Sequence, residues 1–169
     1  GLRFWKYGLT PAYPAAFLFV CLLIVITLID IDQQIIPHVL TLPGIPIFAL
    51  LAVVLMGLTV VESFLGIMIG AGVLYFVAVY YEALTGREGM GGGDVNLLAM
   101  LGAFLGWKSL LFILLASSLM GAIVGIAVIL LKGKDMRYAI PFGPFLCGAA
   151  VLYLFIGEDL TELFFSFRS

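Results

Sequence analysis

The sequence predicts an all-α fold, a polytopic integral membrane bundle of about six transmembrane helices. Hydrophobic residues make up 64% of the 169 residues, whereas charged residues make up only 11%. Soluble domains are about half apolar and about one quarter charged, so this composition excludes an ordinary water-soluble fold. The sequence contains no Pro/Ser-rich linker or long polar stretch, so we expect residues 1–169 to form one domain.

The apolar residues fall into runs separated by short polar junctions. Residues 1–13 are basic and aromatic, as is typical of a membrane interface. Pro37 disfavours helix at Ile36, so the first span should end before this point. Pro43 and Pro46 should bend the first turns of the second span. The expected spans are residues 14–29, 39–60, 63–81, 94–107, 109–131 and 141–157, and residues 158–169 should form an amphipathic surface helix.

Glycines recur four residues apart within two of these spans. Gly66 and Gly70 lie in the third span with Gly72 nearby, and Gly102 and Gly106 lie in the fourth. Residues four apart share one face of a helix, and glycine there lets a second helix approach closely. We therefore expect these glycines to serve helix packing rather than chemistry.

Two acids mark span ends on one side of the bundle. Asp30 closes the first span, and Asp94 opens the fourth directly after Gly91, Gly92 and Gly93. An acid at the lipid boundary is costly and calls for a reason, and glycines let another backbone pass close to it. We predict that Asp30 and Asp94 form a catalytic pair and that the three glycines form the active-site loop.

Two carboxyl groups in a low-dielectric site share one proton. The ionised acid can then take a proton from water while the protonated acid polarises a peptide carbonyl, which is aspartyl proteolysis. This chemistry needs no metal and no other cofactor. The pattern therefore predicts an aspartic-type endopeptidase.

Simpler explanations remain open for each acid. Asp94 would also serve as the N-cap of the fourth helix, and Asp30 and Asp32 would also suit an ordinary membrane interface. As an alternative function, the two acids would form the relay of an ion- or proton-coupled transporter, although transport sites lie nearer the bilayer midplane. A non-catalytic assembly subunit is the third possibility.

Basic residues give the orientation of the bundle. The internal loops on the side of the two acids carry Arg87, Lys132, Lys134 and Arg137, whereas those on the other side carry only Lys108. The positive-inside rule therefore favours a cytoplasmic position for the acids. Counting the terminal segments adds three basic residues to the opposite side and makes the tally four against four.

The remaining polar and sulfur-containing residues carry weaker signals. Cys21 and Cys147 lie inside apolar runs without ligand-like spacing, so we expect two small buried hydrophobes and no metal site. His38 is isolated beside a proline and is expected to be solvated. The net charge of −2 argues against a nucleic-acid partner.

Several motifs together resemble one family. In order they are Asp30-Ile31-Asp32 leading to Ile36-Pro37, then Leu42-Pro43, then Gly89-Met90-Gly91-Gly92-Gly93-Asp94 with Leu97-Leu98, and finally Ile140-Pro141-Phe142-Gly143-Pro144. This set resembles the type IV prepilin leader peptidases, the bacterial branch of the GxGD membrane aspartyl proteases. The resemblance extends over nearly the whole chain.

The resemblance implies a function and a set of site residues. It implies that Asp30 and Asp94 cut the basic leader from type IV prepilins or type II secretion pseudopilins. Cleavage would follow a glycine at the cytoplasmic side of the bacterial inner membrane, with no cofactor for proteolysis. It leaves the oligomeric state unknown. The residues implied to support the site or contact substrate are Asp32, Pro37, Asn96, Pro141 and Gly143.

The sequence also departs from the family pattern. Asn96 stands where the family usually has lysine, and His38 follows the proline where Asp or Asn is common. Many members also N-methylate the new amino terminus with S-adenosylmethionine, an activity associated with an upstream cytosolic segment carrying Cys-x-x-Cys motifs. The present sequence lacks these motifs and begins at Gly1 rather than Met. We therefore expect a missing upstream segment and no methyl transfer by this chain alone.

Overall fold

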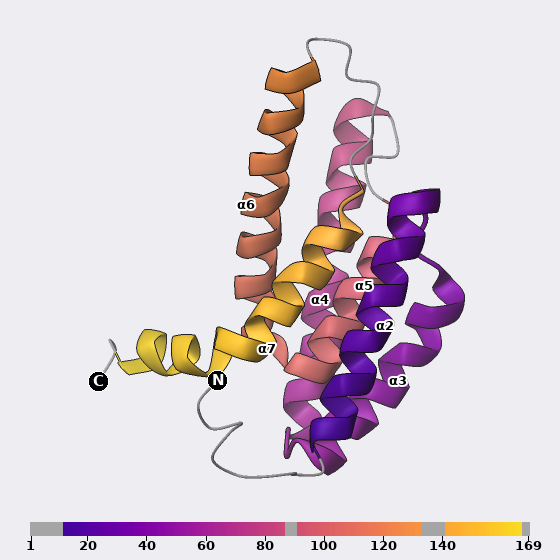
Figure 1. Cartoon of the computed structure of the whole chain (residues 1–169). Helices are drawn as coiled ribbons and strands as arrows, with labels where there is room; N and C mark the ends of the chain where they lie inside the picture. Colours follow the sequence, from indigo (N-terminus) through magenta and orange to yellow (C-terminus); the bar gives the residue numbers. More distant parts are fainter. Residues whose placement is uncertain (1–11, 87–90, 133–140, 167–169) are drawn as a thin grey trace.

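The computed structural model describes residues 12–86, 91–132 and 141–166 (Figure 1). These described ranges are helical apart from short connections, which confirms the all-α fold class. The helices are α2 (Ala12–Gln33), α3 (His38–Leu55), α4 (Val60–Thr85), α5 (Gly92–Leu105), α6 (Trp107–Lys132) and α7 (Gly143–Ser166).

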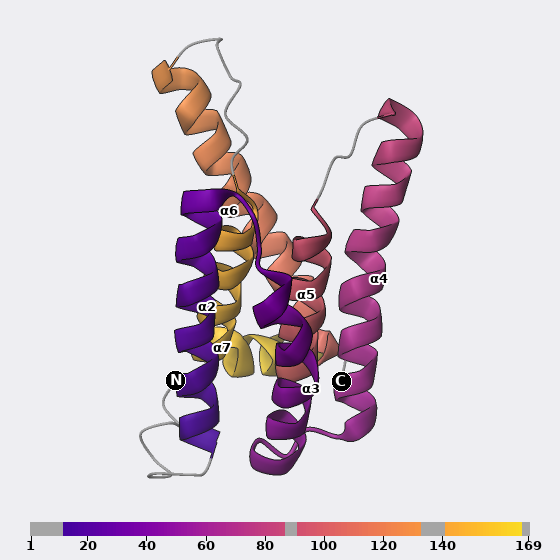
Figure 2. The same cartoon turned by 90° about the vertical axis from the view of Figure 1, so that its right-hand side faces the viewer.

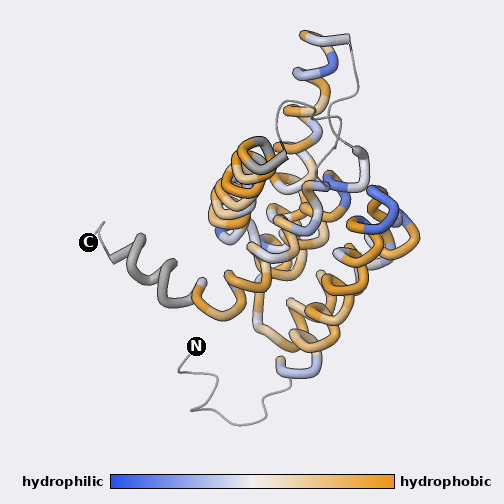
Figure 3. Tube along the Cα trace, turned by 45° about the horizontal axis from the view of Figure 1, so that its top comes forward, coloured by the Kyte–Doolittle hydropathy of each residue, from blue (hydrophilic) through white to orange (hydrophobic). Residues whose placement is uncertain are grey.

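Four of these helices are long and apolar enough to cross a membrane: α2, α3, α4 and the Trp107–Val128 part of α6. The apolar parts of the other two, Gly92–Leu105 and Gly143–Gly157, are shorter. The outer surface remains apolar, with large exposed side chains such as Leu28, Phe76 and Leu111. Figure 3 shows the hydrophobic colouring running along the helices. Such a surface suits lipid rather than water as the surrounding solvent.

Several helix ends differ from the sequence-based prediction. The first helix ends at Gln33, four residues later than predicted. Asp30 therefore lies within its last turn rather than just after the helix. The second helix runs through Pro43 and Pro46. The last helix includes Gly157 and continues to Ser166, so the tail is helical up to Ser166, as predicted, but it continues α7. Its yellow end points away from the bundle in Figure 1.

The short helix α5 lies at the centre of the bundle. It contacts α3, α4, α6 and α7, and Figures 1 and 2 show it between these neighbours. Every residue from 97 to 104 is buried, as expected for a helix that is apolar on all sides. Phe104 of α5 packs against Phe19 and Phe48, with ring centroids 4.2 and 5.4 Å away, and so joins α5 to α2 and α3.

Glycines allow α4 and α5 to touch through their backbones. A Cβ atom on Gly66 would overlap the backbone of Gly102, and a Cβ atom on Gly102 would overlap that of Gly66. A Cβ atom on Gly70 would lie 2.6 Å from the carbonyl oxygen of Leu98. Near the same crossing, the Ser63 hydroxyl donates a 2.7 Å hydrogen bond to the Ala103 carbonyl. The predicted packing role is therefore confirmed at these three glycines.

The other two glycines of the pattern do not pack in this way. Gly72 has open space where its Cβ would lie. Gly106 adopts a φ of 81°, which glycine allows at low cost, and ends α5 just before α6 begins. The packing prediction is therefore wrong for Gly72, and Gly106 serves mainly the turn.

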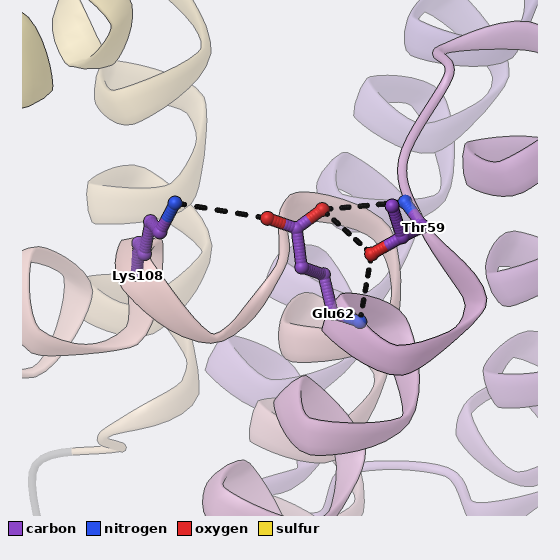
Figure 4. Close-up of polar contacts among 3 residues, drawn as sticks. All are labelled: Thr59, Glu62 and Lys108. Carbon is purple, nitrogen blue, oxygen red and sulfur yellow. Dashed lines mark hydrogen bonds and ion pairs between the residues drawn. The ribbon is translucent and has the colours of Figure 1, made fainter.

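The helices alternate in direction, so their ends form two groups. One group combines the last turns of α2, α4 and α6 with the first turns of α3, α5 and α7. At the opposite end, Glu62 accepts hydrogen bonds from the backbone and side chain of Thr59 and lies 3.6 Å from the Lys108 ammonium (Figure 4). This cluster joins the first turn of α4 to the start of α6. Both predicted catalytic acids lie at the other end.

The α4–α5 contact generates a stability prediction. Gly66→Ala should lower the free energy of unfolding by about 1–3 kcal/mol, because the added methyl group meets backbone that has no space to yield. Thermal unfolding of the purified protein in detergent would measure this loss.

Gly72→Ala is the matched control on the same helix. Its Cβ enters open space, and alanine favours helix over glycine by about 1 kcal/mol. This variant should melt at or above the wild-type temperature. Equal melting of the two variants would show that the backbone contact does not hold the helices together.

Candidate active site

The connection between α2 and α3 brings the chain back into the bundle. The Gln34 amide donates a 2.9 Å hydrogen bond to the Asp30 carbonyl and closes the last turn of α2. Gln34 then adopts a φ of 54°, an unusual conformation for a residue with a Cβ. The next residues differ sharply: Ile35 is 63% exposed, whereas Ile36 is 5% exposed. Ile36 is therefore turned into the protein beside the end of α2.

Ile36 contacts the first turn of α5 at Gly93. A Cβ atom on Gly93 would lie 2.7 Å from Cβ of Ile36 and 3.1 Å from its carbonyl oxygen. A Cβ on Gly92 would have its nearest neighbour, His38, at 3.8 Å, and one on Gly91 would have its nearest neighbour, the Gly93 backbone nitrogen, at 4.0 Å. Of the three glycines in the predicted active-site loop, only Gly93 is therefore required by close packing. Gly89 and Met90 lie outside the described residues.

Ile36 also contacts the first turn of α7, next to Asp30. A Cβ atom on Gly143 would overlap the Asp30 carboxyl group and would lie 3.0 Å from Cδ1 of Ile36. Gly143 thus leaves the space that the Asp30 carboxyl group occupies. Its backbone amide also interacts with that carboxyl group.

Asp30 itself is almost completely enclosed. Its side chain is 4% exposed, and its Oδ2 atom has no hydrogen-bond partner within the described part of the chain. A buried polar atom without a partner costs free energy and calls for an explanation. Packing alone does not require a carboxyl group here, because an apolar residue of the same size would avoid this cost.

Asp94 is the third residue of α5 and lies in its first turn. Gly91 occupies the N-cap position without a side-chain cap, so the explanation of Asp94 as the N-cap is wrong. Asp94 is partly buried. The carboxyl groups of Asp30 and Asp94 lie within electrostatic range of each other. The fold thus brings together two acids that lie sixty-four positions apart (94 minus 30) in the sequence.

The other predicted residues surround these acids to different degrees. Asp32 is exposed and follows Asp30 by two positions, which places it about 200° around the helix. Pro37 is the N-cap of α3, with an extended backbone. Pro141 is partly buried just before α7. Of these three, only Pro37 adjoins a residue that touches the site directly, namely Ile36.

The two positions that depart from the family pattern lie against each other. The side-chain amide nitrogen of Asn96 is 2.9 Å from Nδ1 of His38. His38 is exposed, as predicted, but it is also paired. No sequence pattern predicted this contact, because the two residues are fifty-eight positions apart.

The two cysteines separate in the fold. Cys147 is buried, as expected, and its thiol lies near both acids and contacts Thr27. Cys21 is exposed, so the prediction that it is buried is wrong. In the ranges that the structure describes, no group of three or more His, Cys, Asp or Glu side chains is arranged to hold a metal ion.

The arrangement suits acid–base chemistry. Two interacting carboxyl groups can share one proton, so that one acts as acid and the other as base. Asp94 is only partly buried, whereas Asp30 is enclosed, so the two environments are unequal. Unequal environments are the usual means by which a pair of carboxyl groups takes two roles.

Comparisons with known proteins agree on one family. The model of the type IV leader peptidase family matches residues 17–126, a stretch that contains Asp30 and Asp94. The "Prepilin leader peptidase/N-methyltransferase" of Aeromonas salmonicida is 43% identical over 164 residues, covering 94% of this chain and 55% of that protein. The protein of the same name from Pseudomonas aeruginosa is 36% identical over 169 residues, covering 96% and 56%.

A third relative of that name, from Legionella pneumophila, is 36% identical over 167 residues, covering 96% of this chain and 57% of that protein. The chain thus spans about half the length of the curated relatives it matches. No solved structure matches it. Since the family model covers well over half of the chain, including both acids of the candidate site, this membrane protein belongs to the type IV leader peptidase family.

Proposed function

We propose that this chain is an aspartic-type endopeptidase that removes the basic leader from type IV prepilins or type II secretion pseudopilins. The observation that carries the proposal is the enclosed Asp30 carboxyl group beside Asp94, in a chain of the type IV leader peptidase family. The cut follows a glycine of the substrate on the cytoplasmic side of the bacterial inner membrane. The proposal is limited to the peptidase, because the candidate site supplies the groups for that reaction.

Hydrolysis proceeds through the two carboxyl groups in turn. The ionised acid takes a proton from water, and the water oxygen bonds to the scissile carbonyl carbon. The protonated acid donates to the carbonyl oxygen as negative charge develops there. In the second step the carbon–nitrogen bond breaks, and the leaving amine takes up a proton from the pair. No covalent intermediate forms between substrate and enzyme.

The two helices bias the position of the shared proton. Asp94 lies in the first turn of α5, where the positive end of the helix dipole favours a carboxylate. Asp30 lies in the last turn of α2, where the negative end disfavours charge, and it is also the more enclosed of the two. Each dipole contribution is worth about 0.3–1 kcal/mol. We assign the base role to Asp94 and the proton to Asp30.

The position of the acids favours a peptidase over a transporter. Both acids lie in terminal turns of their helices, at the same end of the bundle. A relay for an ion or proton would have its coupling site near the middle of the membrane. A terminal site is instead reachable by water and by a substrate leader that arrives from outside the lipid.

The first functional prediction concerns the carboxyl groups. Asp30→Asn and Asp94→Asn should each reduce cleavage of a prepilin-like peptide by at least about 100-fold, because each removes one partner of the acid–base pair. The exposed Asp32 provides a matched control on the same helix turn, and Asp32→Asn should retain most activity.

Cleavage by the purified chain would be followed by mass spectrometry, and helix content by circular dichroism. Comparable residual activity in all three folded variants would contradict the assignment of the pair.

The second functional prediction concerns the glycine loop. Gly93→Ala should lower kcat by about 10-fold or more, because its methyl group would push α5 away from Ile36 and move Asp94. Gly92→Ala should stay within about 2-fold of wild type, since its methyl group meets no close neighbour. Steady-state kinetics on the same peptide would measure both. Equal tolerance at the two positions would show that the loop is merely flexible.

The third functional prediction concerns the proton. Infrared spectroscopy across the active pH range should show a protonated-carboxyl band that disappears in Asp30→Asn and persists in Asp94→Asn. Asp30 remains neutral in the latter variant. The opposite pattern, with survival in Asp30→Asn and loss in Asp94→Asn, would reverse the two roles.

A further inference from the structure

A polar bridge joins the start of α3 to the beginning of α5. The side-chain nitrogen of Asn96 and Nδ1 of His38 are 2.9 Å apart. With Nδ1 unprotonated, the Asn96 amide donates and the imidazole accepts. His38 is the first residue of α3, and Asn96 lies two residues after Asp94. The bridge thus links two helices immediately beside the candidate site.

The first turn of α5 has little stability of its own. It begins with Gly92 and Gly93, and glycine is a poor helix former. Its N-cap, Gly91, provides no side-chain hydrogen bond, whereas a polar N-cap contributes typically about 1 kcal/mol. Contacts from outside the helix must therefore fix the turn that carries Asp94.

The chain segment from Ile36 to His38 supplies those contacts. Ile36 packs against Gly93, and the imidazole of His38 lies next to Gly92. The His38–Asn96 hydrogen bond is the third contact. Unlike the two packing contacts, its strength depends on the direction in which the groups approach. Successive residues of a helix are about 100° apart, so Asn96 lies about 200° around α5 from Asp94. The bridge therefore holds α5 from the side away from Asp94 and fixes the rotation of the helix about its axis.

We infer that His38 and Asn96 form a positioning pair that sets the direction of Asp94 toward Asp30. Neither residue is assigned a proton-transfer step, since an amide does not titrate and the His38 Nδ1 atom is engaged by Asn96. The inference rests on the proposed peptidase function for its kinetic consequences. The ordering of the first turn of α5 is a separate consequence that needs no substrate.

The test is a double-mutant cycle on the purified chain. His38→Ala and Asn96→Ala should each lower kcat for a prepilin-like peptide by about 3- to 10-fold, the range expected for loss of one hydrogen bond. KM should change by less than about 2-fold, because the pair acts on the base rather than on substrate binding. The double variant should be no slower than the slower single variant, since both remove the same bond.

A second readout follows the helix without using activity. Hydrogen exchange of the amides of residues 94–97 should be faster in each single variant, by about the same factor, and no faster in the double variant. This measurement separates the two proposals. If the chain cleaves no prepilin-like peptide but exchange responds as stated, the proposed function fails while the bridge stands.

Two further variants complete the design. His38→Asp combined with Asn96→Lys replaces the bridge with an ion pair across the same gap, and it should restore kcat and exchange to within about 2-fold of wild type. Glu62→Gln is the matched control, because it weakens another polar link between helices at the opposite end of the bundle. It should leave kcat and the exchange of residues 94–97 unchanged.

The inference is overturned by any of three results. These are additive losses in the double variant, a rise in KM without a fall in kcat, or unchanged exchange at residues 94–97 in both single variants. Additive losses would mean that the two residues act separately. Unchanged exchange would mean that packing against Ile36 alone holds the turn.

Discussion

Direct backbone contact between α4 and α5 at Gly66 and Gly102 holds the central helix of the bundle in place. With 14 residues, α5 is only about 21 Å long at 1.5 Å per residue, shorter than the hydrocarbon thickness of about 30 Å. It is buried among four other helices instead. Gly66 and Gly102 make this burial possible, because any side chain at the crossing would hold the helices apart. That contact fixes where α5, which carries Asp94 in its first turn, lies against α4.

At the candidate site, Ile36 makes the close packing contacts. It fills the space between Gly93 of α5 and Gly143 of α7, and both glycines leave no space for a Cβ atom. The Asp30 carboxyl group is enclosed beside it with an unpaired oxygen. Close helix packing around α5 offsets the stability lost through that oxygen, because van der Waals contacts rather than burial from water hold helices together in lipid. The bundle can therefore retain a costly group where the proposed reaction needs it.

The polar groups at the two ends of the bundle differ in how completely they are hydrogen-bonded. At one end, Glu62 accepts a hydrogen bond from Thr59 and pairs with Lys108. These exposed contacts stabilise the starts of the helices α4 and α6. At the other end, Asp30 is buried and incompletely satisfied, and Asp94 is partly buried. Polar groups that serve stability alone are normally fully paired. The unpaired oxygen thus distinguishes the end that carries the candidate site from the opposite end.

The sequence was enough to predict the membrane class, the order of the six helices and the position of two acids at helix ends on one side. These features depend on local composition and on the length of apolar runs. Three features became visible only in the folded chain: Gly93 is tightly packed while Gly91 is not, Cys147 lies near the acids while Cys21 is exposed, and His38 contacts Asn96. Such contacts depend on how each helix is rotated and where it crosses its neighbours. Nearly uniform apolar helices carry little local signal for that rotation, because each face is almost as hydrophobic as the next.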